Sequence, residues 1–320
     1  MHKFRTTIEI FVLAVAATAS TAMAAFPERQ ITLTVMLPAG GITDYVGRQL
    51  ADKLRGLLGQ PVVVQNKSGV ALGVAELMRT RPDGYNIGFV SHSYVTITPN
   101  LSDTPFKSPA DLTTIAYVYR TPLLIVTKVE RPWKTAKDLL EAGKATPGKI
   151  RVAGSGIGSV NHVNFVELIS LANSPLPYVP FPGAAPALAA FLGDHTEALV
   201  IPPFEIGPHV ASGKVKILGI FAETRNSSLP DVPTMRELGF DVTGEINGLL
   251  IGPKGMSKEA VNILEQAIRK ATADPDFVAK IAKQTAGEAF FRGANDVEKL
   301  LSTEYGTAKS LVERLKLRQE

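Results

Sequence analysis

The sequence contains no cysteine among its 320 residues. This absence excludes disulfide bonds, thiolate metal sites, a cysteine nucleophile and the lipid-carrying cysteine of a bacterial lipoprotein. We therefore expect the hydrophobic core alone to stabilise the fold. Beyond the N-terminus, no segment approaches the roughly 18 consecutive apolar residues that a membrane-spanning helix needs. We expect the mature chain to be soluble and exported.

Strong charge of either sign is also lacking. The net charge is +4, and no run of five or more basic residues occurs, so the sequence does not predict a nucleic-acid partner. A hydrophobic content of 45% with 20% charged residues is typical of a globular protein. A chain of 320 residues forms one large domain or two ordinary ones.

The N-terminus has the layout of a secretory signal peptide. Lys3 and Arg5 precede the apolar run 10–19, and Ala22-Met23-Ala24 supplies a small-x-small cleavage site. We predict that residues 1–24 form a signal peptide cleaved near Ala24. The mature protein is then expected to be exported, as a free protein without an anchor.

Hydrophobic patterning predicts an α/β fold with mostly parallel sheets. Its strands are apolar throughout rather than alternating, as a sheet covered on both faces requires. The first set comprises strand 31–37, helix 43–58, strand 61–65, helix 70–80 and strand 86–91. The second comprises strand 123–128, helix 135–144, strand 149–153, helix 159–172, strand 178–181, helix 185–192, strand 197–201, helix 204–212 and strand 215–221. A further strand is predicted at 248–252, and the remaining C-terminal part is predicted to be helical.

No long flexible linker separates the two sets, so two lobes would be joined by strands that form a hinge. We expect crossings near 118–125 and near 243–251. Residues 25–121 and 249–320 are then predicted to form lobe 1, and residues 122–248 lobe 2.

Two glycine-containing turns predict anion sites. The apolar strand that begins at Ile31 runs into Gly40 and Gly41, and Thr43 and Asp44 then open a helix. Glycines let a ligand approach the backbone, and the first N–H groups of a helix have no intrahelical partner and face the positive end of its dipole. The stretch 149–162 repeats this design. Together they suggest a ligand held between two lobes.

Enzymatic interpretations find less support. Gly154-x-Gly156-x-Gly158 lacks the last glycine of a dinucleotide fingerprint, because Ser159 stands there. Ser155 lacks the preceding glycine of a nucleophile elbow, since that position is Ala153. No His, Asp or Glu cluster has metal-ligand spacing. We therefore predict no catalytic residues, no metal and no cofactor, although a triad assembled in space stays open.

The roles of two polar residues and two further loops also stay open. Thr43 and Asp44 can either contact a ligand or cap the first helix. The loops at 91–94 and 181–186 follow predicted strands, and parallel sheets bind ligands at the carboxyl ends of their strands. All four loops are therefore expected to converge on one edge.

Short motifs span nearly the whole mature chain. They are Phe26-Pro27, Pro38-Ala-Gly-Gly-Ile-Thr-Asp44, Gly59-Gln-Pro-Val-Val-Val-Gln-Asn66, Pro82-Asp-Gly-Tyr85, Ala153-Gly-Ser-Gly-Ile-Gly-Ser-Val-Asn-His162, Gly183-Ala-Ala-Pro-Ala-Leu188, Leu229-Pro-Asp-Val-Pro-Thr234 and Gly248-Leu-Leu-Ile-Gly-Pro253. Together they resemble one family, the extracytoplasmic solute receptors of the tripartite tricarboxylate transporter, which are the Bug family of proteobacterial periplasmic binding proteins.

The resemblance implies a two-lobed Venus-flytrap fold of type II with a carboxylate between the lobes. In such receptors the loops at 38–44 and 155–162 hold one carboxylate, largely through backbone amides, hydroxyls and ordered water. The candidate ligand-binding residues are Ala39, Gly40, Gly41, Ile42, Thr43, Asp44, Ser91, Ser93, Ser155, Gly156, Ser159, His162, Gly183, Ala184, Ile201 and Glu245. The receptor is expected to be monomeric and to hand its ligand to a large and a small membrane subunit.

Three positions depart from the family pattern. Ala184 replaces a usual serine or asparagine, Ile201-Pro202 replaces a common Asp-Asn pair, and Glu245-Ile246 replaces a common Ser-Trp pair. These changes suggest a ligand whose distal end is more apolar or otherwise unusual. The prediction is thus a receptor for a small organic carboxylate that catalyses nothing. The alternatives are a secreted hydrolase or lyase, and a receptor that serves a sensor.

Overall fold

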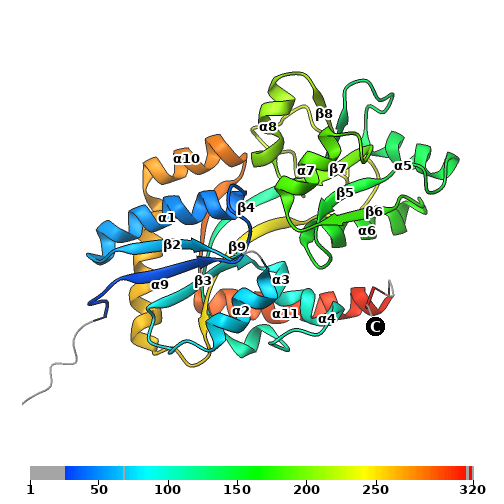
Figure 1. Cartoon of the computed structure of the whole chain (residues 1–320). Coiled ribbons are helices and arrows are strands. Elements are labelled where there is room, and N and C mark those ends of the chain that lie inside the picture. Colours follow the sequence, from blue (N-terminus) through cyan, green and yellow to red (C-terminus); the bar gives the residue numbers. More distant parts are fainter. Residues whose placement is uncertain (1–25, 68, 315–316, 319–320) are drawn as a thin grey trace, which may run out of the picture.

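The computed structural model describes residues 26–67, 69–314 and 317–318, and it forms two α/β lobes joined side by side (Figure 1). The predicted signal peptide lies outside the described residues. No helix in the described part of the chain is both long enough and apolar enough to cross a membrane.

Lobe 1 is organised around three parallel strands. The central β1 (Ile31–Val35) pairs with β2 (Val62–Asn66) on one side and with β3 (Asn86–Ser91) on the other. Parallel neighbours need crossover connections, which are α1 (Ile42–Leu58) and α2 (Val70–Met78). Three antiparallel strands complete the sheet: β9 (Glu245–Pro253), β4 (Leu112–Lys128) and β10 (Glu288–Gly293).

Lobe 2 repeats this plan. Its parallel strands are β6 (Tyr178–Phe181), β5 (Val152–Ser155) and β7 (Ala198–Ile201), and β4 and β8 (Val215–Phe221) add antiparallel pairs. Its helices are α5 (Ala136–Ala145), α6 (Val160–Ala172), α7 (Ala184–Leu192) and α8 (Pro203–Ala211). In both lobes the parallel strands therefore lead into helix N-termini: β1 into α1, β5 into α6 and β6 into α7.

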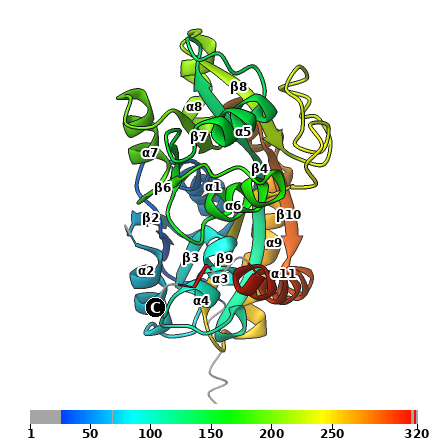
Figure 2. The same ribbon diagram turned by 90° about the vertical axis from the view of Figure 1, so that its right-hand side faces the viewer.

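Strand β4 belongs to both sheets (Figure 2). It pairs with β9 as far as Pro122, opposite Glu245, and with β8 from Leu123 onward, opposite Phe221. The sequence prediction began this strand at residue 123 and was wrong about its first half. The stretch 112–122 carries three threonines and two tyrosines among its apolar residues, and pairing with β9 makes it a strand.

The C-terminal part is helical except for β10, which the sequence prediction missed. Helices α9 (Lys258–Ala273), α10 (Pro275–Thr285) and α11 (Ala294–Arg314) surround it. A strand of six residues gives too short a pattern to be recognised, and its antiparallel partner β4 lies about 170 residues away in sequence. Short helices α3 (Ser93–Thr96) and α4 (Thr98–Leu101) and the 3-10 turn η1 (Pro109–Asp111) link β3 to β4.

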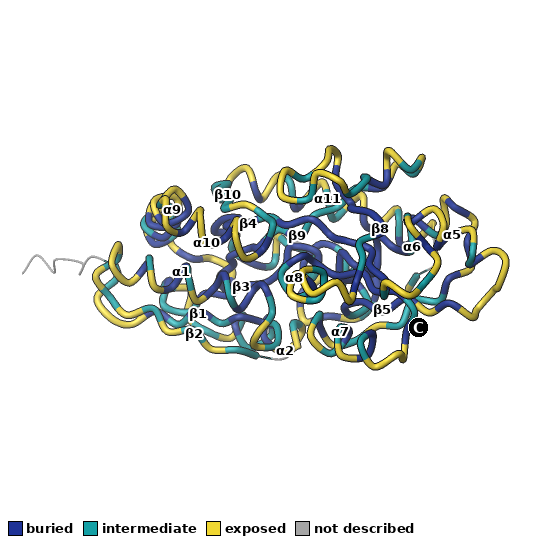
Figure 3. Tube along the Cα trace, turned by 90° about the horizontal axis from the view of Figure 1, so that it is seen from above, coloured by how far each residue is buried: buried dark blue, intermediate teal, exposed yellow. Residues whose placement is uncertain are grey.

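The core follows the sheets, whose strands are buried beneath more exposed helices (Figure 3). On α1, Val46, Leu50 and Leu54 lie on one face and are completely buried. Gly59 ends this helix in the left-handed conformation, with φ of 67°. The buried face of α1 packs on the sheet, so the position of its N-terminus at the cleft is fixed by the core.

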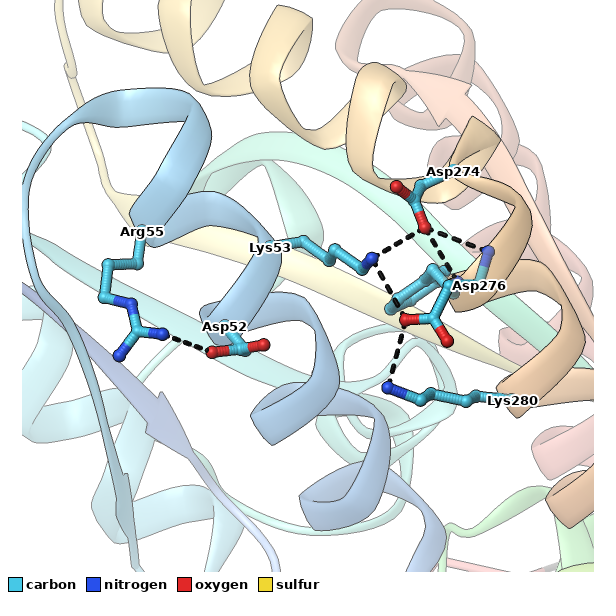
Figure 4. A network of polar contacts seen from close by, with 7 residues as sticks. Asp52, Lys53, Arg55, Asp274, Asp276 and Lys280 are labelled. Atoms are coloured by element: carbon cyan, nitrogen blue, oxygen red, sulfur yellow. Dashed lines mark hydrogen bonds and ion pairs between the residues drawn. The ribbon is translucent and has the colours of Figure 1, made fainter.

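A polar network holds α1 against the C-terminal helices (Figure 4). The Lys53 ammonium lies 2.7 Å from the Asp274 carboxylate and 3.1 Å from that of Asp276. Asp274 is also the N-cap of α10 and accepts the backbone N–H groups of Asp276 and Phe277. The network ties the start of α10 to α1.

Candidate functional site

A cavity lies between the lobes, where five strand-to-helix turns meet, those that lead into α1, α3, α6, α7 and α8. The volume of the cavity is about 60 Å³. On the same measure one water molecule needs roughly 10–15 Å³. The cavity therefore has room for a ligand of few atoms. Its lining consists of Leu37, Pro38, Ala39, Gly41, Ile42, Thr43, Ser91, Ser93, Tyr94, Ser155, Ser159, Val160, Asn161, Gly183, Ala184, Ala185, Pro202, Glu205 and Ile246.

The loop before α1 is shaped by Gly40 and Asp44. Gly40 has φ of 86°, a conformation that favours glycine, and its N–H donates to the Asp44 carboxylate at 3.0 Å. Asp44 also accepts from the Asn66 amide at 2.9 Å and pairs with Arg48 at 2.9 Å. Burial alone would raise the pKa of Asp44, but the bonds from Arg48, Gly40 and Asn66 outweigh it and lower the pKa. Asp44 thus fixes the loop and does not line the cavity.

Replacing Asp44 by asparagine should lower the free energy of unfolding by about 1–2 kcal/mol at pH 7, because the charged acceptor of three donors is lost. A lowered pKa means that this stabilisation is present above the unfolded pKa and disappears as pH falls through the folded one. In urea unfolding, the difference in stability between the wild type and Asp44→Asn should therefore be smaller at pH 3 than at pH 7. Asp52→Asn, an exposed position on the same helix, should change stability little; equal losses in both variants would contradict the assignment.

Thr43 lines the cavity, but its hydroxyl is already engaged. Its Oγ1 lies 3.0 Å from the hydroxyl of the buried Tyr119, on β4. Burial raises the pKa of Tyr119, so this phenol stays protonated. Thr43 therefore joins the start of α1 to β4 and offers the cavity its backbone N–H.

The second turn leads from β5 into α6, and Ser159 is its N-cap. Ser159 Oγ accepts the N–H of His162 and donates to the carbonyl of Ser155 at 3.2 Å. The Asn161 side chain donates to the Val200 carbonyl at 2.8 Å. These bonds tie the start of α6 to β5 and β7, and leave the first N–H groups of the helix facing the cavity.

His162 has a structural role. Burial lowers its pKa to about 4, so the ring is neutral at pH 7. Its Nδ1 accepts the Gly158 N–H at 3.4 Å, and the ring lies against Tyr178 with centroids 5.1 Å apart. It supports the α6 turn from behind and is absent from the cavity lining.

The third turn leads from β6 into α7. Gly183, with φ of 141°, precedes the helix, and Ala184 and Ala185 open it toward the cavity. A side-chain carbon at Gly183 would lie 3.4 Å from Pro38 of the opposite lobe. The two lobes therefore touch at this turn, which closes one side of the cavity.

Three helix N-termini, those of α1, α6 and α7, thus meet at one cavity. Each presents N–H groups without intrahelical acceptors and the positive end of a helix dipole. Among the described residues that line the cavity there is no Lys, Arg or His. An anion would be held by backbone amides and hydroxyls, as at other helix N-termini.

One carboxylate of the chain itself enters this cavity. Glu205, in the first turn of α8, reaches from lobe 2 to the start of α1, where its Oε1 accepts the Ile42 N–H at 3.1 Å. Its Oε2 is buried and has no hydrogen-bond partner. Burial raises the pKa of Glu205 to about 7.

Ten of the sixteen residues predicted from sequence line the cavity: Ala39, Gly41, Ile42, Thr43, Ser91, Ser93, Ser155, Ser159, Gly183 and Ala184. The other six lie outside the lining: Gly40, Asp44, Gly156, His162, Ile201 and Glu245. Ile201 is buried in the core, and Glu245 lies 3.8 Å from Arg120. Their chain neighbours Pro202 and Ile246 line the cavity instead, because adjacent strand residues point to opposite faces.

Sequence reasoning missed Glu205, Tyr94, Asn161 and Ala185. The last three lie within or beside the predicted loops. Glu205 gave no signal of this kind, since its contact to Ile42 spans 163 residues and both lobes. Among the residues that the structure describes, no group of three or more His, Asp or Glu side chains could hold a metal ion.

Comparison with known proteins gives concordant results. A family described as "Tripartite tricarboxylate transporter family receptor" matches residues 46–317. Protein BugT of Bordetella pertussis is 30% identical over 293 residues, 89% of each chain. The structure of the periplasmic binding protein BugD has a TM-score of 0.84 at 29% identity and covers 92% of this chain and all of its own. MatC from Rhodopseudomonas palustris with bound malate has a TM-score of 0.83 at 25% identity, over 90% of this chain and all of its own. The predicted two-lobed periplasmic-binding-protein fold is confirmed.

Proposed function

The chain belongs to the receptor family of the tripartite tricarboxylate transporter, and from this premise we propose that it captures a small organic carboxylate in the inter-lobe cavity and delivers it to the membrane subunits of such a transporter. Like its relatives it is a solute-binding receptor and not an enzyme, so the hydrolase and lyase alternatives fall away. Membership also implies a periplasmic location and a transporter as partner.

The convergence of three helix N-termini on one cavity carries this proposal. Two of them, from α6 and α7, come from lobe 2, and that of α1 comes from lobe 1. A carboxylate between them accepts amide N–H groups from both lobes and so favours the closed arrangement. A neutral sugar or a cation would gain nothing from three positive dipole ends.

We further propose that residues 1–24 are removed during export and that the mature receptor is a monomer that does not bind nucleic acid. Closure would be a hinge motion. Residues 25–121 and 249–320 would move as one body against residues 122–248. The change of sheet partners in β4 between Pro122 and Leu123 supports the first crossing. The second crossing, from lobe 2 back to lobe 1, would be the loop that leads into β9 at Glu245.

A thermal-shift screen of the purified mature receptor tests the proposal. Small carboxylates should raise Tm, because a ligand that binds only the native state stabilises it by about 2.7 kcal/mol at one hundred times its Kd. Calorimetry should then give one site per chain, with the ligand recovered unchanged. A screen in which only sugars or metal cations raise Tm would refute the proposal.

A further inference from the structure

Glu205 places a carboxylate where the fold offers an anion site. Among the described residues of the cavity lining it is the one charged side chain. Its Oε1 takes the N–H of Ile42, at the start of α1. The anion-binding capacity of that helix is therefore partly used by the protein itself. A ligand carboxylate would find its free amides at the remaining N–H groups of α1 and at those of α6 and α7.

Several donors of the cavity lining are engaged by groups other than the second oxygen of Glu205, which has no partner. The Thr43 hydroxyl pairs with Tyr119 at 3.0 Å, and the Ser91 and Ser93 hydroxyls lie 3.3 Å from each other. The Asn161 amide donates to a backbone carbonyl of β7. A buried carboxylate oxygen without a donor is unfavourable. A hydrogen-bond donor on the ligand would satisfy this oxygen.

We propose that Glu205 binds an ammonium group of the ligand and thereby makes the receptor selective for small zwitterionic amino acids over dicarboxylates. This rests on the proposed carboxylate-receptor function and deepens it. The ligand carboxylate lies between the N-termini of α6 and α7, near Ser155, and the free amides of α1, and the ammonium donates to Glu205 Oε2. Each charged group of the ligand then faces the opposite charge: its carboxylate faces the positive helix ends, and its ammonium faces the Glu205 carboxylate.

The same arrangement opposes a second carboxylate. Two carboxylates at one buried site repel each other, and one must be protonated. The lining supplies no Lys or Arg to offset the added charge. The small volume also favours a short amino acid over a long chain. Ala184 and Ile246 line the cavity and offer a distal carboxylate no polar side chain, which agrees with this selectivity.

Calorimetry with matched probes tests the inference on the mature receptor. Propionate, L-alanine, β-alanine and succinate share a short carbon chain and differ in the ammonium or in a second carboxylate. In the wild type, at least one of the two amino acids should bind at least tenfold more tightly than propionate, and succinate more weakly than propionate. Glu205→Gln keeps the acceptor for Ile42 but removes the charge. It should reduce the preference for the amino acid at least tenfold and strengthen succinate binding.

Glu130→Gln, at an exposed turn after β4, serves as the control and should leave all four affinities unchanged. Circular dichroism verifies that Glu205→Gln is folded, and Glu205→Asp, which shortens the reach of the charge, should give an intermediate preference. If succinate or propionate binds the wild type as tightly as the amino acids, or if neither amino acid binds, the inference is wrong while the carboxylate receptor stands. If no carboxylate in a wider panel binds, the proposed function itself fails.

Discussion

Replacing Gly41 by valine should abolish measurable ligand binding, with a loss of at least 100-fold in affinity, while the receptor stays folded. Gly41 is the N-cap of α1 and lines the cavity, and its φ of −86° and ψ of 172° are accessible to valine. A Cβ there would lie 3.5 Å from Glu205 Oε1, so the methyl groups would enter the space between the lobes. They would block approach to the α1 amides and hinder closure.

The magnitude follows from the amides lost. Each buried amide–carboxylate hydrogen bond contributes about 1–3 kcal/mol, and about 1.4 kcal/mol corresponds to a factor of ten in Kd. Calorimetry with the ligand found by thermal shift measures the loss. Gly56→Val provides the matched control, since Gly56 lies on the exposed side of the same helix with nothing within 4 Å of its Cβ position. Unchanged affinity in Gly41→Val would exclude the start of α1 from the site.

The two glycine turns could be predicted from sequence because each is local. A strand, a flexible turn and a capped helix lie within about fifteen residues, and their chemistry does not depend on distant partners. The roles of Thr43 and Asp44 could not be decided in this way. Asp44 is engaged by Asn66 of β2, and Thr43 by Tyr119 of β4, so tertiary partners determine which of them faces the ligand.

The specificity side of the site was harder to predict for the same reason. The sequence singled out the positions of Ile201 and Glu245, yet their neighbours Pro202 and Ile246 face the cavity. An error of one residue in a strand turns a side chain to the other face. Glu205 lies four residues after Ile201, and only the packing of α8 against α1 brings it to the cavity.

Replacing Glu205 by glutamine should stabilise the ligand-free receptor at alkaline pH. Burial raises the pKa of Glu205 to about 7 in the folded protein, against 4.5 without burial. A raised carboxyl pKa means that the folded state binds the proton more tightly than the unfolded state. Stability from this group is therefore greatest below the unfolded pKa and falls as pH rises toward 7. A pKa difference of this size corresponds to about 3 kcal/mol.

Chemical denaturation of the ligand-free protein at pH 5 and pH 8 isolates this contribution, because other groups titrate equally in both proteins. Tyr94 and Tyr119 are the other titratable groups beside Glu205, and burial holds both in the protonated form across this range. The variant should be more stable than the wild type by about 2–3 kcal/mol at pH 8 and by much less at pH 5. Glu130→Gln should show no such pH-dependent difference. Parallel curves for wild type and Glu205→Gln would mean that the carboxylate is well solvated, whereas the expected divergence identifies it as a buried charge that a ligand ammonium can neutralise.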